Sequence, residues 1–151
     1  MKRMIALAGL LSIGGASPVQ AWWQYAEWNL SSSQIAAASG GQAGPCRDDE
    51  PACATPVGGY RPAMLAENIT MIGMPASVSF AFNAKDELVQ TLVYFPGSPL
   101  DLIERLMQGV HGEPVDAAAA QRVWLDMRRN STITALPSAR GSVLLYRPTG
   151  Q

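Results

Sequence analysis

The sequence predicts an α+β fold in which two short helices pack on an antiparallel sheet, in the order helix, three strands, helix, three strands. Strand-like runs occur in two groups, and short polar turns separate the runs within each group, which favours antiparallel pairing of neighbours. A helix-like segment precedes each group. The two halves therefore share an order of elements, although their residues show no repeat.

Two segments carry helical signatures. Ser31 and Gln34 have the spacing of a capping box, which predicts a short helix over 32–39. Ser98 is expected to cap a second helix, with Pro99 at its first position. The apolar residues of this second helix recur at helical spacing on one face, which should pack on the sheet: Leu100, Ile103, Leu106, Met107 and Val110.

Six segments are typical of strands. The clearest two form a predicted β-hairpin over 77–95, in which Val78, Phe80 and Phe82 share one face and residues 83–87 make the turn. The remaining strands are expected at 68–72, 122–127, 131–136 and 142–146.

Two further segments are less regular. Residues 22–30, with three tryptophans and one tyrosine, alternate like a strand that has one face in the core. Residues 42–61 contain glycines, prolines, acidic residues and both cysteines, so we expect a long loop there.

The start of the chain has the order of features that an export signal requires. Lys2 and Arg3 precede an apolar run over 4–15, which is too short to span a bilayer. The small residues around Ala21 then predict cleavage between Ala21 and Trp22. We therefore expect a signal peptide over 1–21, a single domain over 22–151, and a periplasmic or secreted location.

The composition limits the classes of partner that the chain is expected to bind. Without Lys2 and Arg3, the chain has nine basic and twelve acidic residues, a formal charge of −3. It has no dense basic face of the kind that binds nucleic acid. No cysteine lies where a lipid anchor would be attached, and no later run has the length of a membrane span. A protein of the cell envelope is the partner that these features favour.

Cys46 and Cys53 are the two cysteines, and an oxidising compartment favours a bridge between them. The closed loop is short, so we expect stabilisation of about 2 kcal/mol. The alternative, a redox pair, normally has the Cys-x-x-Cys spacing.

We find no motif for catalysis, for a cofactor or for a metal, and therefore assign no residue to those roles. His111, the single histidine, follows a helix and lacks a recognisable nucleophile nearby in sequence. Aromatic residues before the first helix are either core residues or an exposed surface for a partner: Trp22, Trp23, Tyr25 and Trp28.

Several motifs resemble those of small exported proteobacterial proteins. Trp28-Asn29-Leu30-Ser31, followed by Gln34-Ile35, is similar to their Trp-x-Met/Leu-Ser opening, although Asn29 stands where that opening has glycine. Gly112-Glu113-Pro114, Trp124 and Tyr146-Arg147-Pro148 resemble their helix end, a Trp-bearing strand and their last strand. The resemblance implies export and this fold, and it carries over no active site.

These observations leave several functions open. The first is a non-enzymatic binding or interaction module of the cell envelope, and the second is a small inhibitor or immunity-type protein that presents the acidic loop over 46–53. The third is a hydrolase that uses acids alone, with Glu67, Asp86 and Asp126 available. Binding of a small ligand beneath the sheet is a fourth.

Overall fold

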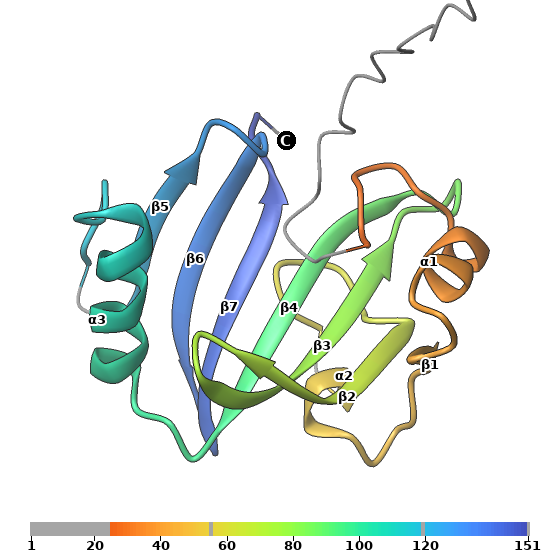
Figure 1. The fold of residues 1–151 in the computed structure, drawn as a ribbon, viewed down its shortest axis with the longest axis horizontal. Coiled ribbons are helices and arrows are strands. Elements are labelled where there is room, and N and C mark those ends of the chain that lie inside the picture. Colours follow the sequence, from red (N-terminus) through yellow and green to blue (C-terminus); the bar gives the residue numbers. More distant parts are fainter. Residues whose placement is uncertain (1–24, 55, 119, 151) are drawn as a thin grey trace, which may run out of the picture.

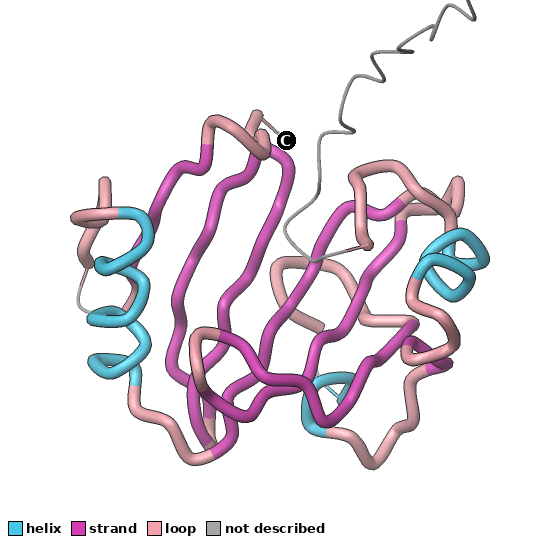
Figure 2. Tube along the Cα trace, in the orientation of Figure 1, coloured by secondary structure: helices cyan, strands magenta, loops and turns pink. Residues whose placement is uncertain are grey.

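A computed structural model describes residues 25–54, 56–118 and 120–150, which form a seven-stranded antiparallel sheet and three short helices (Figures 1 and 2). The strand order across the sheet is β1-β2-β3-β4-β7-β6-β5. In sequence the elements are α1 (Ser32–Ala38), β1 (Ala43–Pro45), α2 (Pro51–Ala54), β2 (Met64–Met71), β3 (Met74–Phe82), β4 (Leu88–Pro96), α3 (Leu100–His111), β5 (Arg122–Asp126), β6 (Ser131–Ser138) and β7 (Gly141–Pro148).

The predicted α+β class is confirmed, but the predicted order of elements is wrong because it omits β1 and α2. Both lie inside the segment that was expected to be a loop. β1 has three residues and too short a pattern to detect, while α2 is a single turn that begins at Pro51. The Glu50 carbonyl accepts hydrogen bonds from the N–H groups of Cys53 and Ala54, each at 2.9 Å.

The sheet buries a hydrophobic layer on each of its faces. On β4 and β7, alternate residues belong to two different clusters, as the two-residue period of a strand requires. The first face carries Val93, Phe95, Leu144 and Tyr146, and it is covered by α1 through Ile35 and by α3 through Ile103 and Met107. The second face carries Leu92, Tyr94, Val143 and Leu145, and it is covered by α2. Figure 1 shows α1 and α3 on opposite sides of the view.

Local signals place the first helix and the central hairpin. The capping box of α1 is present: the Gln34 N–H donates to the Ser31 hydroxyl, and the Ser31 N–H donates to the Gln34 side chain. Asp86, in the turn between β3 and β4, also accepts a hydrogen bond from the Ser32 N–H at 3.2 Å. The predicted hairpin is therefore confirmed, and its turn holds the start of α1.

The strand predicted at 68–72 begins earlier, as β2. Its pairing with β3 shifts register between Ala66 and Ile69, where Asn68 has a φ of 54°. This irregularity breaks the alternation that would reveal a longer strand. The chain then turns at Ile72 and Gly73, which both have positive φ, as a two-residue hairpin turn requires.

Two other expectations are wrong in detail. Residues 25–30 form turns and not a strand, and Asn29 has a φ of 71°, which no extended strand adopts. Residues of both predicted strand faces pack on the same core, because Ala26 is buried and Tyr25 and Trp28 both lie against the first-face core. The cap of α3 is Pro99 and not Ser98, whose carbonyl accepts a hydrogen bond from the Ser142 hydroxyl at 2.8 Å.

Candidate functional site

A disulfide joins Cys46 to Cys53, which confirms the predicted bridge. It fastens α2 to the chain that leaves β1, with 5.8 Å between the two Cα atoms. Arg47, inside the closed loop, forms an ion pair with Glu50 and another with Glu67 at 3.2 Å. The side chain of Arg47 also donates hydrogen bonds to both carboxylates, and these bonds raise the pKa of Arg47, the bond to Glu50 having the larger effect. The acidic loop is therefore tied to β2 as well as closed on itself.

The segment after α2 is also held against the sheet. The Arg147 guanidinium on β7 donates to the Gln90 side-chain oxygen at 3.0 and 3.1 Å, and to the carbonyl oxygen of Gly58. Gly58 lies in the turn between Val57 and Tyr60, whose backbones bond to each other. The disulfide and this arginine thus fix both ends of what we call the second-face cover, which consists of α2 and the turn between Val57 and Tyr60.

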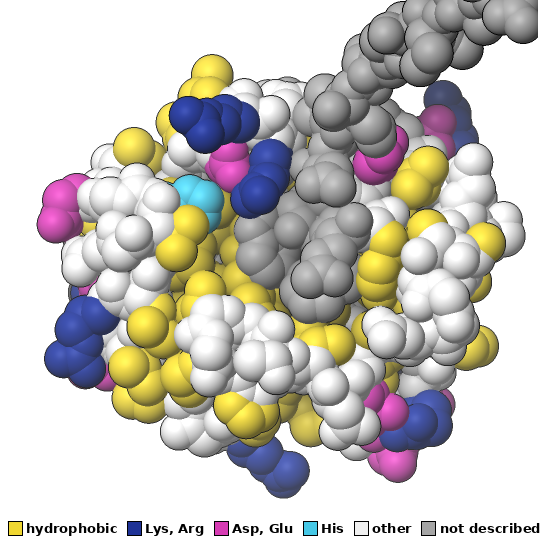
Figure 3. Space-filling view, in the orientation of Figure 1, with side chains coloured by type: hydrophobic (Ala, Val, Ile, Leu, Met, Phe, Trp, Pro, Cys, Tyr) yellow, Lys and Arg dark blue, Asp and Glu magenta, His cyan; other side chains and the backbone are white. Residues whose placement is uncertain are grey.

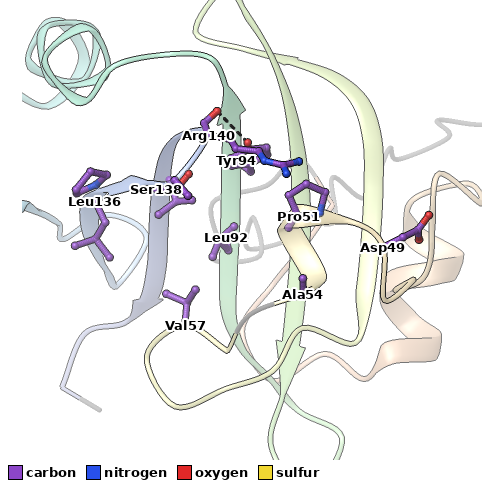
Figure 4. A pocket seen from close by; sticks show the side chains of 13 residues that line it. Asp49, Pro51, Ala54, Val57, Leu92, Tyr94, Leu136, Ser138 and Arg140 are labelled. Atoms are coloured by element: carbon purple, nitrogen blue, oxygen red, sulfur yellow. Dashed lines mark hydrogen bonds between the residues drawn. The ribbon is translucent and has the colours of Figure 1, made fainter.

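Between this cover and the β6–β7 hairpin lies a groove of about 570 Å³. Figure 4 shows its lining side chains coming from α2 and its flanks on one side and from the β6–β7 end on the other. Leu92, Tyr94 and Val143 are buried side chains of the second face and form its floor. The walls and rim are these residues: Asp49, Pro51, Ala52, Ala54, Val57, Leu136, Pro137, Ser138, Ala139 and Arg140.

The chemistry of the groove favours binding of an apolar group. Its floor is aliphatic and aromatic, and the Tyr94 hydroxyl donates to the Arg140 carbonyl at 3.1 Å, so this polar atom is already used (Figure 4). Its charged groups, Asp49 and Arg140, are exposed residues of opposite sign. A few polar groups around an apolar floor are typical of a binding site, where they orient what the floor holds.

The structure describes two of the four residues of the predicted aromatic surface. Tyr25 and Trp28 are partly buried and pack against the first-face core, with the Tyr25 and Phe80 rings 6.2 Å apart. Trp22, Trp23 and the expected cleavage site at Ala21 lie outside the described residues. A partner surface formed by these aromatic residues stays a prediction.

The three acids considered for hydrolysis lie on different elements, and each carboxylate has a hydrogen-bond or ion-pair partner. Glu67 on β2 pairs with Arg47, and Asp86 holds the start of α1. Asp126 ends β5 and accepts the backbone N–H groups of Arg128 and Arg129, each at 3.2 Å. These contacts give all three carboxylates a structural role.

His111 ends α3 and is partly buried. This burial lowers the pKa of His111, while the nearby carboxylate of Asp126 acts in the opposite direction. The residue after it, Gly112, accepts a hydrogen bond from the Trp124 indole N–H at 2.9 Å. The structure thus joins the end of α3 to β5.

Among the described residues, no helix has the length and apolar character needed to cross a membrane. Searches against family models, curated proteins and solved structures return no match for the chain. The groove was not predicted from the sequence because three stretches that are distant in the chain build it. Its one sequence signal is the cysteine pair, which marks where the second-face cover is fastened.

Replacing both cysteines with serine is expected to lower the free energy of unfolding by about 2 kcal/mol, because the bridge closes a short loop. Urea denaturation followed by circular dichroism measures this change. The wild-type protein under reducing conditions is the matched control and should lose the same amount. A double variant as stable as the oxidised wild type would show that the bridge does not stabilise the fold.

Proposed function

We propose that this chain is an exported, non-enzymatic binding module of the cell envelope, which holds an apolar side chain of a partner protein in the groove beside the Cys46–Cys53 bridge. The groove itself carries the proposal. Its volume of about 570 Å³ lies in the range of ligand sites, about 300–1,000 Å³. Export rests on the signal-peptide pattern of residues 1–21 and predicts a secreted protein that begins at Trp22.

Rigidity supports binding at this place. A surface that is already ordered loses less conformational entropy when a partner binds. The disulfide fixes α2, Arg47 ties the acidic loop to β2, and Arg147 holds the turn at Gly58. The groove is therefore formed before the partner arrives.

The charges at the rim indicate which partner segment fits. Asp49, which also pairs with Arg47 at 3.6 Å, lines the groove on the side of the acidic loop, and Arg140 lines it on the side of the β6–β7 hairpin. A segment with an apolar anchor would meet complementary charge if it carried a basic residue on one side and an acidic residue on the other. An extended peptide of this composition is the occupant that we propose.

An inhibitor-type function is the second candidate, favoured by the same disulfide-held loop. In that case the acidic loop enters the partner's cleft, and the groove stays empty. Neutralising the loop with Asp48→Asn and Asp49→Asn would then weaken binding much more than filling the groove does. The two functions are thus distinguished by whether changing the acidic loop or filling the groove causes the larger loss of binding affinity.

The test fills the groove without touching the core. Ala54 is exposed, lines the groove and is the last residue of α2, so Ala54→Arg places a long charged side chain in it. Ala38→Arg is the matched control, because Ala38 is exposed and is the last residue of α1 on the first face. Peptides selected from a displayed library on the wild-type protein should bind Ala54→Arg roughly tenfold more weakly or worse, since the new charge occupies an apolar site.

Fluorescence anisotropy of a labelled selected peptide measures these affinities. We expect Ala38→Arg to bind like the wild type, and the selected sequences to share an apolar residue beside a basic one. Equal binding by Ala54→Arg and the wild type would contradict a role for the groove.

A further inference from the structure

Exposed apolar side chains gather at the edge of the sheet formed by β5. Among the described residues, the exposed large hydrophobic side chains are Tyr60, at 36%, and four that lie around this edge: Val110 at 62%, Val115 at 65%, Leu125 at 45% and Met127 at 76%. Helical spacing predicts Val110 on the buried face of α3, and its exposure is a correction to that prediction. Single exposed apolar residues are ordinary, but a cluster marks an interaction surface.

A second groove of about 530 Å³ runs through this cluster, between the end of α3 and the turn from β5 to β6. It is lined by Val110, His111 and residues 125–129. On the face drawn in Figure 3, the chain's single histidine (cyan) lies near both hydrophobic and charged side chains. This surface is separate from the groove beside the disulfide.

The backbone of β5 is partly open on its outer side. Val123 is covered there, because its N–H donates to the Asp116 carbonyl and its carbonyl accepts from the Val115 N–H, both at 2.8 Å. Backbone groups of an antiparallel strand face the same side at every second residue, so Leu125 also faces outward. No described residue forms a backbone hydrogen bond with Leu125 on that side. An open, apolar edge residue of this kind is a template for another strand.

Two charges flank the open position. Asp116 lies beside Val123 on one side of Leu125, and Arg128 follows on the other. Neither side chain forms an ion pair or hydrogen bond within 25–54, 56–118 and 120–150. The charges around them are paired, since Arg122 binds Glu104 at 2.8 Å and Arg129 binds Asp126 at 3.5 Å.

These positions are complementary to themselves under a two-fold axis through Leu125. In antiparallel pairing about that residue, the outward backbone groups of Leu125 in the two copies face each other, while those of Val123 stay bonded to Asp116 and Val115 of the same copy. Val115 and Asp116, which cover Val123, then lie beside Met127 and Arg128 of the second copy. β5 ends at Asp126, and Met127 already lies in the turn that leads to β6. Val115, Leu125 and Met127 thus each meet an apolar residue of the other copy, and Asp116 and Arg128 each meet the opposite charge.

We propose that the occupant of this edge is a second copy of the chain, and that the end of β5 at Leu125 pairs antiparallel with Leu125 of that copy to form a symmetric dimer. The interface is isologous: it contains Leu125 against Leu125 once, and the Val115–Met127 and Asp116–Arg128 contacts twice. It does not depend on the proposed function, because the residues involved do not line the groove beside the disulfide.

Sedimentation equilibrium of the oxidised protein over a wide concentration range tests the dimer. We expect a reversible monomer–dimer equilibrium for the wild type and a monomer for Leu125→Asp, with unchanged circular dichroism. Tyr60→Asp is the matched control, because Tyr60 is exposed and distant in sequence from the edge, and it should dimerise like the wild type. A wild type that stays monomeric throughout, or a Leu125→Asp variant that dimerises normally, would overturn the proposal.

A charge exchange tests the register. Arg128→Asp and Asp116→Arg should each weaken the dimer roughly tenfold, because each places like charges together twice per dimer. The double variant Asp116→Arg/Arg128→Asp should recover most of the wild-type affinity. Additive loss in the double variant would rule out this pairing.

Discussion

Replacing Trp124 with alanine is expected to lower the free energy of unfolding by about 3–5 kcal/mol. Trp124 lies in the first-face core with 1% of its surface exposed, and it is the largest of the fully buried side chains. Its indole N–H also donates to the Gly112 carbonyl at 2.9 Å, so the same side chain joins β5 to the end of α3. Urea denaturation, followed by far-ultraviolet circular dichroism, measures the loss.

Trp124→Phe separates packing from the hydrogen bond. Phenylalanine keeps most of the apolar volume but leaves the Gly112 carbonyl without its indole donor, so we expect a smaller loss, about 1–2 kcal/mol. If the alanine variant is no less stable than the phenylalanine variant, Trp124 does not pack as the structure indicates.

Gly141→Ala should produce the second large effect, about 2–4 kcal/mol, because an added methyl group overlaps backbone atoms. A Cβ at Gly141 would collide with the carbonyl oxygen of Phe95 and lie 3.0 Å from the backbone nitrogen of Gly97. Gly141 pairs with Pro96 on β4 and with Ser138 on β6, so neither neighbour moves without disturbing a ladder. Thermal and urea unfolding both measure the change.

Gly44→Ala is the control for this substitution. Gly44 also lies in a strand, β1, but a Cβ there meets no atom within 4 Å. We expect its stability to change by less than about 0.5 kcal/mol, as for other surface substitutions. Equal losses at Gly44 and Gly141 would mean that β4 and β7 do not approach as closely as described.

The parts of the fold that sequence reasoning predicted depend on neighbouring residues. A capping box needs Ser31 and Gln34, which are three positions apart, and the turn at 83–87 needs polar residues between two alternating runs. The same reasoning found six strands, since each carries its own pattern. Local structure of this kind is encoded within a few residues, and the sequence alone suffices for it.

The remaining features depend on residues that are distant in the chain. β1 is a strand only because β2 pairs with it, and α2 is positioned by Cys46 and by the second face of the sheet. The groove joins Pro51 to Ala139, and no pattern in either segment refers to the other. Periodicity likewise gives the direction of the Val110 side chain and does not reveal whether another element covers it.

The strand order has a consequence for how the chain reaches this structure. Every neighbouring pair in the sheet is also consecutive in the chain, except β4 and β7. The entropy cost of closing a long loop therefore arises at one ladder, which extends from the Thr91–Tyr146 pair to the Pro96–Gly141 pair. The strand pairs on either side are joined by shorter segments than β4 and β7, so their contacts form sooner. Assembly of the sheet thus reduces to the encounter of two locally organised halves, and the rate of folding depends on β4 meeting β7.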